Sequence, residues 1–315
     1  MDFDAVCVGA CTVDWLVRLE SFPEPDGRLP IEDFITSFGG MAATAAVALA
    51  RLGAHVGFVG AVGDDDLGRA ILDDLRAEGI DCATARPTPG ARSTRSIVLS
   101  SIPSGLRSIL VQPSTAAVPS VDHIALLARR GQHLHLDYTA FTVLTPDALA
   151  RWRAEGVVVS VDAGTPIPNL PAYLAQIDVL VVPRGRLRAL AVGTDSPVDA
   201  DGDIERSVRA IQARGPRTVV VTLGERGCVG ATGDRPLARM PAFTVDVMDT
   251  TGAGDVFNGA LVYALRRYPD LGPALRFAGA AAALSCQAIG GRAACPTLTE
   301  VEIFLKAHRE MGMEE

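Results

Sequence analysis

Short apolar runs alternate with segments of helical periodicity along most of the chain, and this alternation constrains the fold more than any other feature. Strands are expected between these helices, and the runs that predict them are residues 4–10, 56–62, 133–137, 157–162, 179–182 and 218–223. Helices are expected at residues 41–52, 66–78 and 203–213. Continuous apolar strands that alternate with helices are typical of a parallel sheet covered on both faces. The predicted fold class is therefore α/β, with three α/β/α layers and a mostly parallel central sheet.

Two segments break the alternation. Residues 15–38 are rich in proline, glycine and charge. Residues 92–113 contain two runs of alternating polarity, 95–101 and 107–111, and the Pro-Ser-Gly sequence between them predicts a hairpin. No linker is long enough to divide the chain, so residues 1–315 are expected to form a single domain.

Two helices are predicted near the end of the chain. Residues 274–289 are rich in alanine and predict a closely packed helix that ends at Gly290-Gly291. Thr297 and Glu300 have the spacing of a capping box, which predicts the start of the last helix.

Composition and charge exclude several classes of protein. The chain has 315 residues, 48% of them hydrophobic, and a net charge of −8, which argues against a surface for nucleic acid or for anionic membranes. No apolar run approaches the ~20 residues that a membrane-spanning helix needs. The acidic start of the chain leads into a strand and does not resemble a signal peptide, so a cytoplasmic protein is expected. Six cysteines without CxxC spacing predict free thiols in a reducing compartment.

The scarcity of lysine narrows the chemistry further. Lys306, near the end of the chain, is the only lysine. A Walker A loop, a protein kinase and a pyridoxal enzyme each need a lysine in a defined structural position, which Lys306 does not fit. If the protein binds phosphate, it must therefore do so with backbone amides, arginine or a metal ion.

One glycine-rich segment is the main candidate for chemistry. Residues 243–247 are expected to form a strand and residues 256–267 a helix, so Gly252, Ala253 and Gly254 stand in a turn before a helix N-terminus. Backbone amides are unpaired at that place and the helix dipole is positive. Because the turn residues are small, an anion can reach these amides.

Asp255 follows the turn directly. A carboxylate beside an anion site would repel a bound phosphate unless it has another task. Accepting the proton of an attacking hydroxyl is such a task, and an anion hole next to a base describes phosphoryl transfer to an alcohol. The alternative is a helix-capping aspartate in an ordinary glycine turn.

Residues 249–261 resemble the C-terminal signature of the ribokinase-like (PfkB) sugar kinases, D-T-x-G-A-G-D-x-F-x-G-A-L, with every position filled. The resemblance implies that Asp255 is the catalytic base and that residues 252–255 form the anion hole for the γ-phosphate. It also implies a ribokinase-like fold in which residues 15–38 and 92–113 form a small β-sheet lid. ATP and magnesium are the cofactors that it implies.

On the acceptor side, the resemblance assigns Asp14 to the sugar hydroxyls and brings the backbone of Gly39 and Gly40 close to the sugar. Thr44 stands where the family usually has asparagine, so it would contact the acceptor through a hydroxyl instead of an amide. An anionic sugar would need positive groups. Three lid arginines are candidates for this role or for solvent-facing positions: Arg28, Arg95 and Arg107.

On the nucleotide side, the resemblance places Thr222 and Gly224 along the ATP phosphates and ribose, with Gly227 in a tight turn. Asn258 is also assigned to the nucleotide. Asp249 is assigned to a potassium ion together with carbonyls near Gly290-Gly291; the other interpretation, given equal weight, is that Asp249 only anchors the turn through hydrogen bonds.

The chain departs from the family pattern after the strand at residues 179–182. Family members commonly carry an N-x-x-E pattern there that helps to place magnesium, and Arg184 and Leu187 occupy the corresponding positions. A magnesium–water network would then be held by other groups, or the arginines would contact phosphate directly.

The predicted function is ATP-dependent phosphorylation of a hydroxymethyl group of a sugar. Segments such as residues 39–53 and 241–261 look closest to the sulfofructose kinase and ketohexokinase branch of the family, which implies a ketose-like acceptor. Exposed lid strands often pair between subunits, so a homodimer through the lid is expected. Two alternatives stay open. One is a nucleoside kinase of the same fold, with an apolar wall from Trp15, Phe22 and Phe38, and the other is a non-catalytic regulator that binds sugar or nucleotide.

Overall fold

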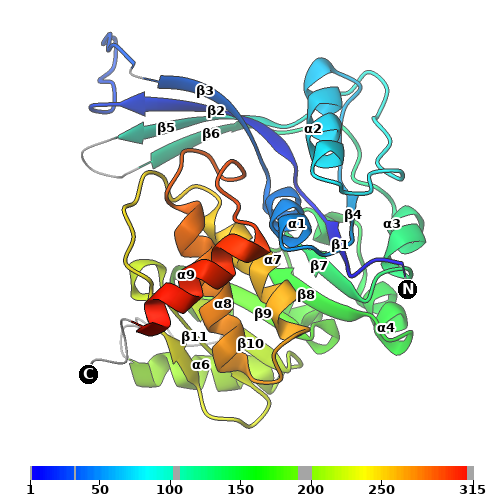
Figure 1. The fold of residues 1–315 in the computed structure, drawn as a ribbon. Coiled ribbons are helices and arrows are strands. Elements are labelled where there is room, and N and C mark those ends of the chain that lie inside the picture. The colour runs from blue at the N-terminus through cyan, green and yellow to red at the C-terminus, as the bar shows by residue number, and fades with distance from the viewer. Residues whose placement is uncertain (1, 32, 102–106, 191–200, 311–315) are drawn as a thin grey trace.

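The computed structural model describes residues 2–31, 33–101, 107–190 and 201–310 and contains two β-sheets (Figure 1). The larger sheet has eight strands in the order β12-β11-β10-β9-β8-β7-β1-β4. All neighbours from β4 to β10 are parallel, whereas β11 and β12 run antiparallel to their neighbours. Its strands, in chain order, are β1 (Ala5–Val8), β4 (Val56–Val59), β7 (His133–Leu136), β8 (Val158–Asp162), β9 (Val179–Pro183), β10 (Thr218–Thr222), β11 (Cys228–Thr232) and β12 (Ala238–Met240).

Helices cover both faces of the larger sheet. Successive residues of β1 enter different cores, because strand side chains alternate between the two faces: Ala5 and Cys7 pack in one hydrophobic cluster, and Val6 and Val8 in the other. The first cluster includes residues of α1 (Met41–Arg51), α2 (Asp66–Ala77), α7 (Ala253–Leu265), α8 (Leu271–Ser285) and α9 (Leu298–Glu310). The second includes residues of α3 (Val121–Ala128), α4 (Pro146–Ala154), α5 (Arg184–Leu190) and α6 (Asp201–Gln212). The predicted three-layer α/β/α fold with a mostly parallel sheet is confirmed.

The second sheet is the predicted lid, and in Figure 1 it projects beyond the main body of the molecule. Its four strands are arranged in the order β3-β2-β5-β6. They are β2 (Thr12–Leu19), β3 (Asp33–Gly39), β5 (Arg95–Ser101) and β6 (Arg107–Gln112). The antiparallel pairing of β5 with β6 is the expected hairpin, whose Pro-Ser-Gly connection lies outside the described residues.

Two sequence predictions about the chain near the candidate site are wrong. Residues 243–247 form no strand; instead, the ring of Phe243 packs edge-on against Phe304 and His308 of α9. Of the apolar residues in this alternation, Phe243 packs against the helix, whereas Val247 is 60% exposed. The alanine-rich helix α8 ends at Ser285 and does not continue to residue 289, since the carbonyl of Cys286 accepts hydrogen bonds from Met248 and Asp249.

A buried carboxylate connects the sheet to the first helix of the site. Asp137, directly after β7, is fully buried and accepts hydrogen bonds from the amides of Ala10 at 2.6 Å and Ala42 at 3.2 Å. It therefore fixes the start of α1 against the carboxyl end of β1. A Cβ on Gly9 would collide with this carboxylate, so only glycine fits there.

Two expectations from composition can be compared with the structure. None of the helices among the described residues is long and apolar enough to cross a membrane. The cysteines are free thiols, as predicted: Cys7, Cys11, Cys82, Cys228, Cys286 and Cys295.

Candidate active site

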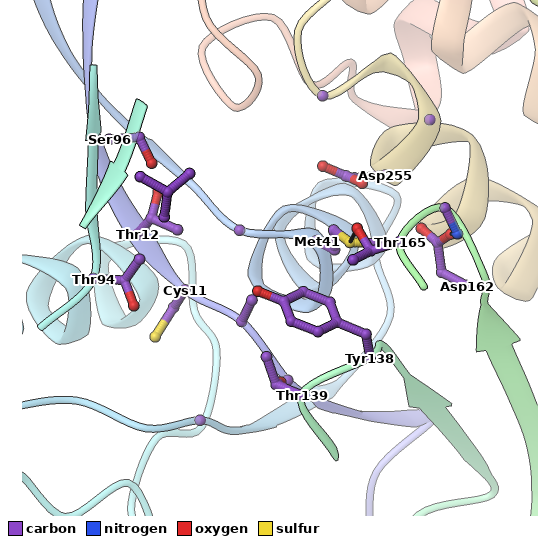
Figure 2. Close-up of a pocket in the computed structure, with 18 of the residues that line it drawn as sticks. Cys11, Thr12, Met41, Thr94, Ser96, Tyr138, Thr139, Asp162, Thr165 and Asp255 are labelled. Carbon is purple, nitrogen blue, oxygen red and sulfur yellow. Dashed lines mark hydrogen bonds between the residues drawn. The ribbon is translucent and has the colours of Figure 1, made fainter. Parts of the chain in front are cut away.

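A cavity of about 710 Å³ lies between the lid and the carboxyl ends of the parallel strands. Such an edge is where ligands bind in open α/β sheets. Figure 2 shows Asp255 at the start of α7 on one side of the cavity and Thr12 and Ser96 of the lid strands on the other. Asp162, from the end of β8, lies near the first turn of α7.

The turn before α7 has the geometry of an anion site. Gly252 has a φ of 76°, which disfavours any side chain, and a Cβ on it would lie 2.6 Å from the Cα of Gly291. Among the hydrogen bonds of the described residues, none uses the amides of Gly254 or Asp255. These amides stand at the positive end of the helix dipole. Ala253 is part of the same turn, but its amide already donates to the carbonyl of Thr250.

Asp255 is half-buried at this helix start. Burial, together with the nearby carboxylates of Asp162 and Asp137, raises the pKa of Asp255 well above its ordinary value, and the charge of Arg107 opposes this shift. A carboxylate with a raised pKa is a stronger base than an exposed one. The side chain is therefore suited to accept a proton from a hydroxyl in the cavity.

On the lid side, the cavity is built around Asp14, which lies within strand β2. Its carboxylate accepts a hydrogen bond from the hydroxyl of Thr12, and burial raises its pKa. A Cβ on Gly39 would collide with this carboxylate, so the glycine leaves the space that Asp14 occupies. Gly40, with a φ of 94°, packs against the backbone of Ala10 and lines the cavity.

Not every predicted acceptor residue lies in the cavity. Thr44 is buried in α1, only 1% exposed, and does not line it. Arg95 pairs with Gln112 across the lid hairpin and donates a hydrogen bond of 2.5 Å to that side chain. Neighbouring strand residues point to opposite faces, so Arg95 faces away from Ser96 and from the cavity. Neither residue enters the function proposed below.

A second cavity, of about 690 Å³, lies beside the first. It is lined by Thr222, Gly224 and Gly227 and by the irregular segment around Phe243 and Val245. The positive φ of Gly227, 88°, fits the tight turn that was predicted there. The two cavities share a wall made of Arg107, Pro183, Thr222, Thr250 and Gly254.

Asn258 lines the first cavity and not the second, although it was assigned to the nucleotide. Its amide donates hydrogen bonds to Asp162 at 2.9 Å and to the carbonyl of Gly254 at 3.0 Å. Asn258 therefore connects the end of β8 to the first turn of α7. Its Oδ1 is buried and accepts no hydrogen bond from the described residues.

A second loop supports the anion site from behind. Asp249 accepts hydrogen bonds from the amide and hydroxyl of Thr251, at 2.9 and 2.7 Å, and from the amide of Gly290 at 3.0 Å. The buried Arg292 forms an ion pair of 2.5 Å with Asp74 and donates a hydrogen bond of 2.6 Å to the carbonyl of Gly39. The loop at residues 290–292 thus holds both the anion turn and the backbone next to Asp14.

Sequence reasoning did not single out Asp137, Asp162 or Tyr138 as site residues. Asp137 and Asp162 are each the last residue of a predicted strand, and the carboxyl ends of neighbouring parallel strands meet at one edge of the sheet. Their position at the ends of predicted strands could therefore have identified both aspartates as candidate site residues. Tyr138 lines the cavity but carried no comparable pattern.

Comparison with known proteins identifies the family. The family described as "pfkB family carbohydrate kinase" matches residues 2–298. A ribokinase of Bacillus subtilis is 32% identical over 308 residues, covering 95% of this chain and 99% of the relative. An ATP-dependent ribose-1-phosphate kinase of Halopiger xanaduensis is 32% identical over 298 residues, covering 93% and 95%. Arabidopsis thaliana ribokinase, solved with ribose and ATP, superposes with a TM-score of 0.83 at 26% identity, covering 97% and 99%.

The chain therefore belongs to the pfkB family of carbohydrate kinases. It is a phosphotransferase with an alcohol group as acceptor, and its fold is that of the ribokinases, as predicted. The resemblance to the sulfofructose kinase and ketohexokinase branch stays a prediction.

Two glycine substitutions in the anion turn are expected to differ. Gly252→Ala should lower the free energy of unfolding by about 1 to 3 kcal/mol, because the new methyl meets Gly291 and the positive φ is strained. Gly254→Ala should change it by less than about 1 kcal/mol, since no atom of the described residues lies within 4 Å of the added Cβ. Denaturant titration of both variants measures the difference. Equal destabilisation would contradict the assigned turn geometry.

The raised pKa of Asp255 predicts the acid side of the pH–rate profile. The base works only when ionised, so kcat/KM should fall as the pH drops through the pKa of Asp255. Because burial and neighbouring carboxylates raise that pKa, the fall should begin well above the ~3.9 of an ordinary aspartate. Initial rates at limiting acceptor, measured from neutral to acidic pH, test this. Full activity maintained down to that ordinary value would contradict the assignment.

Proposed function

We propose that the enzyme transfers the γ-phosphoryl group of ATP to a hydroxymethyl group of a neutral sugar. The observation that carries the proposal is that Asp255 and the free amides of Gly254 and Asp255 line one side of a cavity that also contains Asp14. Asp14 accepts hydrogen bonds from sugar hydroxyls. Asp255 accepts the proton of the attacking hydroxyl while its oxygen bonds to the γ-phosphorus and ADP leaves. The free amides stabilise charge on the transferred group.

The charges around the cavity favour a neutral acceptor. Asp14, Asp162 and Asp255 line it, and the buried Asp137 lies next to Tyr138 of its wall. Arg107 is the only lysine, arginine or histidine among the described lining residues. This number of carboxylates around the cavity would repel a phosphate or sulfonate group on the sugar.

Ribose is the first acceptor to test, because several similar proteins are ribokinases. The ketose-like acceptor that the sequence predicts also has a hydroxymethyl group and stays a prediction.

The second cavity has the features that ATP requires. It adjoins the anion turn, and a Cβ on Gly224 or Gly254 would meet no atom of the described part of the chain within 4 Å, so the backbone is open to a ligand at both places. We place the phosphates along Thr222 and Gly224. The adenine then lies toward Phe243 and Val245, which supply an apolar wall.

Magnesium fits this site as an ion carried by the ATP phosphates. Among the described residues, no three His, Cys, Asp or Glu side chains form a metal cage, and Leu187 of the N-x-x-E position is buried. Two hard oxygen donors that line the first cavity are the carboxylate of Asp162 and the Oδ1 of Asn258, which accepts no hydrogen bond from the described residues. When bound, magnesium neutralises phosphate charge.

For Asp249, the hydrogen bonds to Thr251 and Gly290 support the anchoring interpretation. A potassium ion in the same place stays a prediction.

The two alternatives are less well supported. The residues suggested as an aromatic wall for a nucleobase do not line the cavity; Trp15 and Phe38 lie on the opposite face of the lid from Asp14. The intact anion turn and its neighbouring base do not support the hypothesis of a non-catalytic regulator. We therefore retain the kinase as the function.

An acceptor panel tests the proposal. ATP-dependent ADP release should be strong with one neutral sugar among ribose, deoxyribose and fructose, and weak with ribose 1-phosphate, fructose phosphates and nucleosides. Asp255→Asn should lower kcat about a hundredfold to ten-thousandfold, because it removes the base. Asp246 is exposed and lies in the segment that leads to the anion turn, outside both cavities. Asp246→Asn is therefore the matched control. An Asp255→Asn enzyme with the wild-type rate would refute the base.

We also propose that the lid's outer face pairs with a second copy of the chain. Phe34, Ile97 and Leu110 share this face in the strand register and are 61%, 39% and 56% exposed. Phe34→Lys with Leu110→Lys should convert a dimer to a monomer in sedimentation equilibrium, because charge disrupts an apolar contact. Ile303→Lys, at an exposed apolar position on α9, is the control. A wild-type monomer at micromolar concentration would refute the dimer.

A further inference from the structure

We propose that Arg107 of lid strand β6 is a catalytic residue that binds the phosphoryl group during its transfer. The inference rests on the proposed kinase reaction and adds to it a residue that the family signature does not contain. Its role is to supply the full positive charge that the anion turn lacks.

The position of Arg107 sets it apart from the other cationic side chains. Its Nη1 donates a hydrogen bond of 2.9 Å to the hydroxyl of Thr250, two residues before Gly252. Among the described residues that line either cavity, Arg107 is the only arginine, lysine or histidine. It belongs to the shared wall, where the γ-phosphate must pass from nucleotide to acceptor.

The chemistry requires such a charge. In phosphoryl transfer, negative charge is spread over the oxygens of the transferred group, and kinases commonly stabilise it with lysine, arginine and metal ions. The amides of Gly254 and Asp255 carry only partial charges. Lys306 lies on α9 and lines neither cavity. A guanidinium forks around two phosphate oxygens, and its geometry suits this task.

The same strand that carries Arg107 also covers the acceptor. Ile109 and Val111 follow Arg107 on the same face of β6 and line the acceptor cavity. Val111 pairs with Ser96, and Ser96 pairs with Asp14, so Val111 stands in the same cross-strand row as the acceptor carboxylate, two strands away. Arg107 and the side chains that enclose the sugar therefore belong to the same strand. The position of the lid thus also sets the position of the positive charge.

A rival role for Arg107 is recognition of an anionic acceptor. Its place along β6 argues against this role. Arg107 is four residues from Val111, or roughly 13 Å along the strand from the row that contains Asp14. The guanidinium instead contacts Thr250, just before the anion turn. This is the place where the proposed reaction binds the phosphoryl group.

Steady-state kinetics with the best neutral acceptor tests the proposal. Arg107→Met should lower kcat about a hundredfold and change the acceptor KM less than about threefold, because Arg107 contacts the phosphoryl group in ATP, and more strongly in the transition state, but does not contact the acceptor. Arg107→Lys should recover part of the loss, since it restores the charge without the fork. Arg92→Met, in the lid segment but outside both cavities, should keep the wild-type rate. An unchanged kcat with a raised acceptor KM would overturn the assignment.

A binding measurement keeps the test independent of the acceptor. By calorimetry, Arg107→Met should weaken ATP binding about tenfold and leave ADP binding unchanged, because only ATP carries the phosphoryl group that Arg107 contacts. Equal affinities of wild type and variant for ATP would refute the role. If the wild type phosphorylates no sugar, the proposed function fails, and the ATP-to-ADP comparison still decides whether Arg107 reads the γ-phosphate.

Discussion

The site depends on a close contact between two glycines, which a side chain at Gly252 would prevent. Gly252 starts α7 with a positive φ, and Gly291 of another loop lies against it where a Cβ would be. Asp249 reinforces the contact by accepting hydrogen bonds from both loops. Because the turn is held from behind, its free amides face the cavity without any side chain to position them.

Charge in the cavity is unbalanced before any ligand binds. Carboxylates from β2, β8, the residue after β7 and the start of α7 approach each other, and burial raises the pKa of Asp137, Asp162 and Asp255. Positive potential comes from the helix start and from Arg107. In the proposed reaction, this arrangement keeps Asp255 basic and leaves binding of the phosphate to the amides, to Arg107 and to the metal ion that the nucleotide would bring.

The sequence was sufficient to predict the fold and the anion turn, since strand and helix periodicities and an unbroken motif are local signals. It failed at residues 243–247, where the polarity alternates without strand pairing and only Phe243 packs against α9. The sequence also did not show which of the lid arginines faces the cavity. Arg95 and Arg107 lie on paired strands, and only the hairpin register shows that one faces outward and the other the cavity.

Asp137 and Asp162 were missed for a different reason. Each belongs to a separate strand, and their meeting depends on the order of strands in the sheet, which no short segment of sequence contains. Thr44 illustrates the opposite case. The position of Thr44 in the motif predicted a substrate contact, but its side chain is on the buried side of α1.

An anion site made from amides has a consequence for mutational robustness. A side-chain substitution can remove a carboxylate or a guanidinium, but it cannot delete a backbone N–H unless it introduces proline. This chain departs from its family pattern at Thr44, Arg184 and Leu187, positions where the usual residue would act through its side chain. The turn at residues 252–255 is unaltered. In the proposed reaction, the chemical step therefore keeps its backbone donors whatever side chains stand at those three positions.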